Sequence, residues 1–386
     1  MMDSQAIMDQ VRKIVGTTVL IACRVVPVKK NKVVFKSFCG RSFNDSPRYI
    51  FEALKDIAPD GEYIWLMNEP KRIEIEGAEV VKRSSIKALY HMATAKIWVD
   101  NCRMMPYWMK KRNNQFYIQT WHGGVALKAI EADAADTLTE SYLKRAKNDS
   151  KLADLLISEC EKCTQNYREA FWYGGEILKS GSPRSDIFAQ NIDEVRLKVY
   201  KTMGLKDTDK LVLYAPTFRD SKTLSCYQLD TERLLQAMEK RFPGEWKVAI
   251  RLHPNVSKLQ NSIPYNERVL NGSIYPEMNE LLMASDVLIT DFSSSLFDAF
   301  HIRKKVFLYA TDLHEYQKSE RRLYYDMKDL PASFSESTEE LEKNIEEFSE
   351  KVYYQRLEAF VKELGFYGDG HASETVASRI VEEMNK

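Results

Sequence analysis

The chain has 386 residues, which is long enough for two domains that each bury a core of their own. Hydrophobic residues make up 44% and charged residues 29%, a balance typical of a folded protein, so a mainly disordered chain is excluded. The 56 basic side chains equal the 56 acidic ones in number, so no net charge attracts nucleic acid, and none is expected as a partner.

The six cysteines are thinly spread, and only Cys160 and Cys163 stand close together, as C-x-x-C. A disulfide scaffold or a zinc ribbon would need further pairs at regular spacing. We therefore expect ordinary buried or half-buried thiols at this pair, no metal site, and a reducing compartment.

Residues 1–30 combine apolar and basic character and are candidates for a segment that associates with a membrane surface. The apolar run Ile14–Cys23 has ten residues, about half of the ~20 needed to cross a bilayer, so it cannot be a complete span. Between Met1 and Arg48 there are nine basic and only three acidic residues, and three lysines closely follow the apolar run: Lys29, Lys30 and Lys32. The alternative is a first helix packed on the body with solvated lysines, and the residues alone favour neither.

Residues 31–180 are predicted to form a first α/β domain. Short apolar runs alternate here with helical stretches, which implies a mostly parallel sheet covered on both faces. Strands are expected at Val33–Lys36, Tyr63–Met67, Lys96–Asp100, Phe116–Thr120 and Leu152–Ser158, with helices that include Tyr49–Ile57 and Ser85–Thr94.

Residues 181–386 are predicted to form a second α/β domain, because the turn signals Gly174-Gly175 and Gly181-Ser182-Pro183 interrupt the first series. Strands are expected at Leu211–Tyr214, Trp246–Leu252, Asp286–Thr290 and Val306–Tyr309, and helices at Thr231–Lys240, Glu277–Ala284 and Ser294–Ile302. Seven glutamates within Glu336–Glu350 predict a solvated helix face.

Ligands of open α/β sheets bind beyond the carboxyl ends of the strands, so polar residues directly after the apolar runs are candidates for chemistry. His122 follows the run Phe116–Thr120, beside two glycines that allow close approach of a substrate. Its imidazole could take a proton from a hydroxyl at neutral pH. The alternative is a histidine that only stabilises its loop.

Three further strand ends carry groups suited to a diphosphate. Arg251 and His253, before Pro254, would share one side of a strand and supply positive charge, unless they face solvent on an edge strand. Hydroxyls and backbone amides after Asp291 suggest an anion site, with helix capping as a compatible alternative: Ser293, Ser294 and Ser295. Thr217 and Arg219 follow another strand, where Arg219 could clamp a phosphate or pair with Asp220.

Sequence signatures of several enzyme classes are absent. The chain has no G-x-x-x-x-G-K-[ST], no G-x-G-x-x-G after its first strand and no G-x-S-x-G. These absences argue against a P-loop NTPase, a dinucleotide oxidoreductase and a serine hydrolase. What remains is a pair of α/β halves with His, Arg and Ser groups suited to a diphosphate, which suggests a transferase that uses a nucleotide-activated donor.

Five short motifs together resemble the CDP-glycerol glycerophosphotransferase family, the teichoic-acid primases and polymerases of Gram-positive bacteria. The resemblance extends from about Lys32 to the end, including Asp369–Ser373, and departs at Gly124-Val125, where the family commonly has Thr-Pro. The motifs are Thr120–Gly123, Gly181–Asp186, Tyr214–Asp220, Arg251–Pro254 and Ser285–Ser294.

The resemblance implies a GT-B-like fold, with an acceptor-side and a CDP-donor-binding Rossmann-like domain facing across a cleft. It implies attack by an acceptor hydroxyl on the β-phosphorus of a CDP-polyol, with His122 as general base and release of CMP. His253 would assist catalysis at the diphosphate. The implied diphosphate-binding residues are Arg251, Thr217, Arg219, Ser293, Ser294, Ser295 and Asp291, which also orients its turn. Tyr275, Pro276 and Glu277 would hold cytidine, and Gly123, Pro183 and Arg184 would support the site.

The acceptor in this family is a lipid-linked glycopolymer, which favours peripheral association with an anionic membrane surface at the cytoplasmic face. The expected donor is CDP-glycerol, with CDP-ribitol as an alternative. No cofactor or metal is required, although a diphosphate can carry Mg²⁺ into the site. The rival hypotheses are a GT-B glycosyltransferase that uses a nucleotide sugar and a non-catalytic membrane-associated binding protein.

Overall fold

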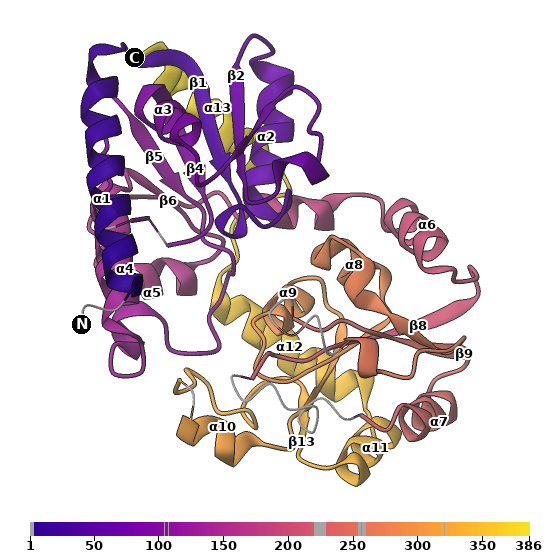
Figure 1. Cartoon of the computed structure of the whole chain (residues 1–386). Helices are drawn as coiled ribbons and strands as arrows, with labels where there is room; N and C mark the ends of the chain where they lie inside the picture. The colour runs from indigo at the N-terminus through magenta and orange to yellow at the C-terminus, as the bar shows by residue number, and fades with distance from the viewer. Residues whose placement is uncertain are drawn as a thin grey trace. The chain divides into compact units, whose positions relative to one another are not determined.

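The chain folds into two compact α/β units (Figure 1). The computed structural model describes residues 4–103, 105–106, 108–219, 229–253, 256, 260–319 and 321–386. The first unit comprises Met1–His122, Glu131–Asp186 and Tyr367–Lys386, and the second comprises Gly123–Ile130 and Ile187–Phe366.

The first unit is built on a seven-stranded parallel sheet with the strand order β3-β2-β1-β4-β5-β6-β7. Its strands are β1 (Lys29–Lys36), β2 (Glu62–Met67), β3 (Glu79–Lys82), β4 (Ala95–Asp100), β5 (Phe116–Gln119), β6 (Leu155–Ile157) and β7 (Glu176–Leu178). Its helices are α1 (Ser4–Ala22), α2 (Asp45–Ile57), α3 (Ile86–Thr94), α4 (Glu140–Leu152), α5 (Glu161–Ala170) and α13 (Ala372–Asn385).

Side-chain alternation along β1 explains why this sheet has helices on both faces. Val33 and Phe35 belong to a core cluster that includes residues of α2 and α13. Val34 belongs to a second cluster, with residues of α3 and with Leu20 of α1 packed against it. A strand buried on both faces carries a continuous apolar run, which is why this strand was predicted from the sequence.

The second unit is built on a six-stranded parallel sheet with the order β10-β9-β8-β11-β12-β13. Its strands are β8 (Asp209–Ala215), β9 (Glu245–Ile250), β10 (Val269–Asn271), β11 (Val287–Thr290), β12 (Lys305–Tyr309) and β13 (Ser333–Ser335). Its helices are α6 (Ile192–Met203), α7 (Thr231–Arg241), α8 (Met278–Ala284), α9 (Ser295–His301), α10 (Leu313–Ser319), α11 (Thr338–Glu346) and α12 (Glu350–Leu364). Two doubly wound parallel-sheet domains are therefore present, as predicted.

The division between the units differs from the predicted boundary. It falls between Asp186 and Ile187, a few residues later than expected, and residues 367–386 return to the first unit instead of completing the second. The return is anchored at Asp186, whose carboxylate accepts hydrogen bonds from the backbone N–H groups of Ala372 (3.0 Å) and Ser373 (2.7 Å). The motif Gly181–Asp186 and the late segment Asp369–Ser373 thus meet in a structural joint.

The basic N-terminal region also differs from expectation. β1 begins at Lys29, so the lysines after the apolar run lie in a strand. Lys32 is fully buried, with Nζ 2.7 Å from Glu62 Oε1, and Lys29 pairs with the same carboxylate. The prediction that Lys32 binds lipid headgroups is therefore wrong. Among the described residues, no helix is long and apolar enough to cross a membrane.

Two smaller predictions can be compared with the structure. Cys160 and Cys163 are buried free thiols, which confirms the interpretation of the C-x-x-C pair. The acidic helix is α11, but its glutamates are not only solvated. Arg233 of α7 pairs with Glu339 and Glu342, and Lys240 of α7 pairs with Glu346, because α7 and α11 pack side by side.

Candidate active site

His122 lies at the carboxyl end of β5 with its imidazole exposed. Its Nδ1 is 2.7 Å from the backbone oxygen of Asn101, an acceptor, so Nδ1 carries the proton and Nε2 keeps its lone pair. The Trp121 ring packs on the imidazole at a centroid distance of 4.2 Å, and Trp121 has a φ of 57°, an unusual conformation for a bulky residue. The local geometry leaves Nε2 available as a base.

Asn101 is a residue that the sequence analysis did not single out. It is buried directly after β4, and its Oδ1 accepts a hydrogen bond from the Phe38 N–H at 2.7 Å. Its Nδ2 donates to Asp45 Oδ1 (3.0 Å) and Ser37 Oγ (3.3 Å). Because β1, β4 and β5 are neighbours, Asn101 joins two loops: its side-chain amide binds the loop after β1, and its backbone carbonyl binds His122. Its position just after a strand was the available signal.

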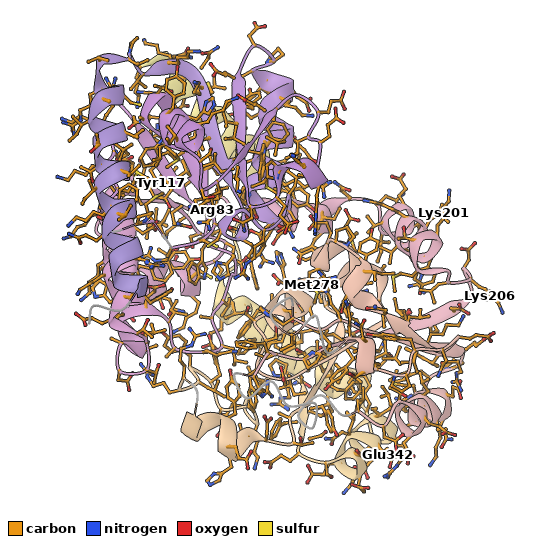
Figure 2. The ribbon with its side chains drawn as sticks, in the orientation of Figure 1. Arg83, Tyr117, Lys201, Lys206, Met278 and Glu342 are labelled. Atoms are coloured by element: carbon orange, nitrogen blue, oxygen red, sulfur yellow. The ribbon has the colours of Figure 1, made fainter. Side chains whose placement is uncertain are left out.

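A buried polar network lies beneath the His122 loop. Gln119 Oε1 accepts from the Trp121 N–H at 2.9 Å, and Gln119 Nε2 donates to Asp149 Oδ2 at 3.1 Å. The hydroxyl of Tyr117, labelled in Figure 2, donates to Asp149 Oδ1 at 2.8 Å. Burial raises the pKa of Asp149 to about 7, against the opposing charge of Arg103. The network holds Trp121 in its unusual conformation.

Charged groups surround the neighbouring loop after β1. Lys36 Nζ lies 2.6 Å from Asp100 Oδ2, and both side chains are buried. A hydrogen bond with Cys102 and the charge of Lys36 lower the pKa of the Cys39 thiol to about 7 despite its burial. Sequence reasoning had no signal for this group, because its members come from two strand ends far apart in the chain.

Two of the predicted supporting residues, Pro183 and Arg184, lie in the joint with the C-terminal helix. The Arg184 N–H donates to Ser46 Oγ at 3.4 Å, and the guanidinium lies 3.7 Å from Glu159. The Pro183 carbonyl accepts from Ser373 Oγ at 3.3 Å. Their contacts in the first unit are structural.

In the second unit, the Arg219 guanidinium forms ion pairs with two carboxylates. Its guanidinium lies 2.9 Å from Asp291 Oδ2 and 2.7 Å from Asp312 Oδ2. Asp291 Oδ1 also accepts from the Thr217 N–H at 2.7 Å, as expected of a residue that orients its turn. Arg219 thus ties together the loops after β8, β11 and β12. The expected partner Asp220 lies outside the described residues.

The three serines lie at the start of α9, after β11. Ser293 Oγ accepts from the Ser295 N–H at 3.3 Å and lies 2.9 Å from Ser295 Oγ, so it binds the first N–H of α9. The N-cap position itself is Ser294, whose side chain makes no capping hydrogen bond. Ser294 is half-buried, and its hydroxyl has no hydrogen-bond partner among the described residues. Its oxygen is available to a ligand.

Arg251 lies outside the strand predicted to contain it. β9 ends at Ile250 and is an inner strand between β10 and β8, so both the alternation argument and the edge-strand alternative are wrong. The Arg251 guanidinium donates to the carbonyls of Gly272 (3.1 Å), Tyr275 and Pro276 (3.3 Å). It therefore organises the connection that leads from β10 to α8.

His253 follows Arg251 and is exposed, with its ring 5.6 Å from the Phe218 ring. Pro254 lies outside the described residues. The predicted cytidine-binding segment has mixed exposure, since Pro276 is exposed whereas Tyr275 and Glu277 are buried. The Tyr275 hydroxyl donates to Glu280, so it is already used within the second unit.

The predicted site residues therefore form two groups. The first unit holds His122, Pro183 and Arg184, and the second holds Gly123, Thr217, Arg219, Arg251, His253, Tyr275, Pro276, Glu277, Asp291, Ser293, Ser294 and Ser295. Within the described part of the chain, no cluster of three or more His, Cys, Asp or Glu side chains could hold a metal ion.

Known relatives cover nearly the whole chain. A teichoic acid poly(glycerol phosphate) polymerase of Bacillus spizizenii is 30% identical over 373 residues, which are 93% of this chain and 93% of the relative. A polymerase of the same name from Staphylococcus epidermidis is 31% identical over 377 residues. The match covers 93% of this chain but 52% of that relative, so the chain spans about half of the Staphylococcus protein's length.

Solved structures show the same fold. A histidine variant of the wall teichoic acid polymerase TagF has a TM-score of 0.84 and 27% identity, with 99% of both chains covered. Another TagF variant, soaked with CDPG, has a TM-score of 0.83. The predicted GT-B-like pair of α/β domains is confirmed.

A model of the family described as CDP-glycerol:poly(glycerophosphate) glycerophosphotransferase matches residues 19–382. This match confirms the resemblance seen in the five motifs. The chain belongs to the CDP-glycerol:poly(glycerophosphate) glycerophosphotransferase family.

Proposed function

We propose that this enzyme transfers glycerol phosphate from CDP-glycerol to a hydroxyl of a lipid-linked teichoic-acid-type glycopolymer and releases CMP. The observation that carries the proposal is the exposed His122, whose Nδ1 is bound to the Asn101 carbonyl, in a chain of this family. The polymerases that the chain resembles are named for poly(glycerol phosphate), and TagF has been solved after a soak with CDPG.

The reaction uses His122 as general base. The acceptor oxygen forms a bond to the β-phosphorus of the donor while its proton passes to His122 Nε2. The bond from that phosphorus to the bridging oxygen breaks, and the bridging oxygen leaves with CMP. General base assistance of this kind contributes typically ~10²–10⁴ in rate.

The second unit binds the donor in this proposal. The Ser294 hydroxyl, the Thr217 loop and the exposed His253 act on the diphosphate, where donors aimed at developing charge lower the barrier. Arg219 and Asp291 hold these loops, and Arg251 holds the segment Tyr275–Glu277 against which cytidine binds. No cofactor is obligatory, and any Mg²⁺ enters with the donor diphosphate.

We also propose that the enzyme works at the cytoplasmic face of the membrane as a peripheral protein. Four exposed apolar residues recur three to seven positions apart along α1 and its extension, and so form one stripe: Val11 (52% exposed), Ile14 (57%), Ile21 (59%) and Val25 (88%). An apolar stripe of this kind lies in the boundary between headgroups and acyl chains.

Donor screening tests the proposed reaction. The purified chain is incubated with an acceptor and, separately, CDP-glycerol, CDP-ribitol or a UDP-sugar, while nucleotide release and product mass are followed. CMP release with CDP-glycerol and a mass gain of one or more glycerol phosphate units is the expected result. CMP release with CDP-ribitol alone would favour the ribitol alternative, since a poly(ribitol-phosphate) polymerase of Bacillus spizizenii is 28% identical. UDP release without CMP would reject the proposal.

A further inference from the structure

A small pocket lies where the end of α1 meets α3 and the segment before β5. Its volume is about 150 Å³, and all of its lining residues belong to the first unit. Leu20, Ala93 and Trp108 line it with apolar surface that is buried or half-buried. Its other members include three cations, the exposed Arg24 and Lys110 and the half-buried Arg112.

The positive charge of this pocket is not neutralised locally. No carboxylate lines it, and neither Arg24 nor Lys110 has an ion pair with a described residue. Arg112 uses Nη1 to donate to the Val26 carbonyl at 2.7 Å, which fixes its guanidinium beside the end of α1. The amide of Gln115 is fully used, because its Nε2 donates to backbone carbonyls and its Oε1 accepts from the Arg112 N–H. The pocket therefore has one fixed cation, Arg112, and two exposed cations, Arg24 and Lys110, with no carboxylate among its lining residues. Such a group favours an anionic ligand.

The surroundings indicate that this ligand is amphiphilic. Ile21 belongs both to the pocket and to the exposed stripe on α1, and Val25 continues that stripe beside Arg24. A free anion would gain nothing from the apolar wall, whereas a lipid can place its phosphate among the cations and its glycerol backbone and acyl chains along the stripe.

We propose that this pocket binds the phosphate headgroup of an anionic membrane glycerophospholipid and thereby anchors the first unit at a defined point on the bilayer. The inference rests on the proposed membrane association and adds a specific site to it. Each basic residue near an anionic surface strengthens binding about fivefold, and a fixed cluster beside an apolar wall selects for anionic lipid over zwitterionic lipid.

The main test compares two double variants in vesicle flotation with the full chain. Arg24→Gln/Lys110→Gln removes the two exposed pocket cations. Lys71→Gln/Lys201→Gln removes the same charge from exposed positions elsewhere, and Lys201 is labelled on α6 in Figure 2. On phosphatidylglycerol–phosphatidylcholine vesicles the pocket variant should bind about 30-fold more weakly, and the control variant within about twofold of the parent. Equal losses in the two variants would assign binding to net charge and overturn the proposal.

A second variant distinguishes binding of a headgroup inside the pocket from general attraction of lipid to a basic surface. Thr17→Phe places an aromatic ring in the pocket and leaves every charge in place. Headgroup binding in the pocket predicts weaker flotation with anionic vesicles, whereas simple surface attraction predicts unchanged or stronger flotation, and that result would count against the site. Thermal unfolding of each variant checks that the fold is retained, and the exposed Arg24 and Lys110 can be replaced without disturbing the core.

Competition distinguishes a lipid from a free phosphate. Short-chain phosphatidylglycerol should release the chain from anionic vesicles, and inorganic phosphate at matched ionic strength should not. Release by inorganic phosphate would assign the pocket to a free anion and sink the lipid proposal. CMP release by the parent chain with CDP-glycerol and a soluble acceptor is measured without vesicles, so failure of the proposed reaction is seen separately from failure of the lipid site.

Discussion

At the residue scale, the tautomer of His122 links the structure to the chemistry. The Asn101 carbonyl accepts a hydrogen bond from the Nδ1–H group, and the imidazole therefore presents Nε2 as a base. Replacement His122→Ala is expected to lower the rate of CMP release by ~10²–10⁴, the usual contribution of a general base. The matched control is His314→Ala, which removes an exposed histidine from α10. Wild-type turnover in His122→Ala would exclude the catalytic role.

Gln119 is expected to act on catalysis only through the position of His122. Its side chain satisfies the Trp121 N–H and reaches Asp149, so Gln119→Leu leaves the part-buried Trp121 N–H without its acceptor and loosens the loop. We expect kcat for CMP release to fall by about tenfold or more, with little change in KM for CDP-glycerol. A rise in KM with normal kcat would show that Gln119 serves donor binding instead.

Asp149 should make the stability of the first unit depend on pH. Burial raises its pKa to about 7, compared with about 4 in an unfolded chain, so the folded state binds the proton more tightly. This contribution to stability is complete below about pH 4 and is lost as pH rises through 7. The free energy of unfolding should therefore fall, relative to that of Asp149→Asn, by a few kcal/mol between pH 5 and pH 8. Urea unfolding of both proteins at the two pH values measures the difference, and parallel behaviour would contradict it.

At the element scale, the attachment of α13 gives a structural role to the motif Gly181–Asp186 and to the segment Asp369–Ser373. Asp186 accepts from the first two N–H groups of the helix, and α13 buries Val376, Ala377 and Ile380 in the core beside α2. Asp186→Ala is expected to lower the free energy of unfolding by about 2 kcal/mol, at the upper end for a helix cap. Asp193→Ala in the first turn of α6 is an exposed control. Equal stability of the two variants in chemical denaturation would argue against this role.

Element prediction succeeded for buried strands and failed at the edges of the sheets. The four strands missing from the sequence interpretation are β3, β7, β10 and β13, and each is an edge strand of three or four residues. Inner strands are covered on both faces and need continuous apolar runs, whereas a short edge strand carries polar or half-buried residues that give no such signal.

At the scale of the whole molecule, the apolar stripe on α1 is expected to determine membrane affinity. Ile14→Ser/Val25→Ser removes two exposed side chains from the stripe, and Leu197→Ser/Ile274→Ser removes two from the second unit as a control. Since each buried apolar side chain contributes about 1.5–3 kcal/mol, the stripe variant should bind vesicles at least about tenfold more weakly. Similar losses in the control variant, measured by flotation, would show that the stripe has no special role.

The candidate site was predicted unevenly. His122 followed from its place after a buried strand and from its motif, and Asp291 has the orienting contacts expected of it. Asn101 carried no motif of its own and was missed. The pairing of Arg219 with Asp312 could not be predicted from neighbours in the sequence, because Asp312 is 93 residues away and reaches Arg219 only after β8 and β12 join the same sheet.

Apolar runs and local motifs alone were sufficient to predict two parallel-sheet domains and the family. Each buried inner strand needs a short continuous apolar run, and the residues at each strand end form a short motif, so both signals are local in the sequence. Tertiary structure decided which polar groups satisfy one another. It placed Lys32 with Glu62, Arg219 with two aspartates, and the C-terminal helix on the first unit. Each of these pairings depends on segments far apart in sequence that meet only when the sheets form, since a buried charge or amide must find its partner in space.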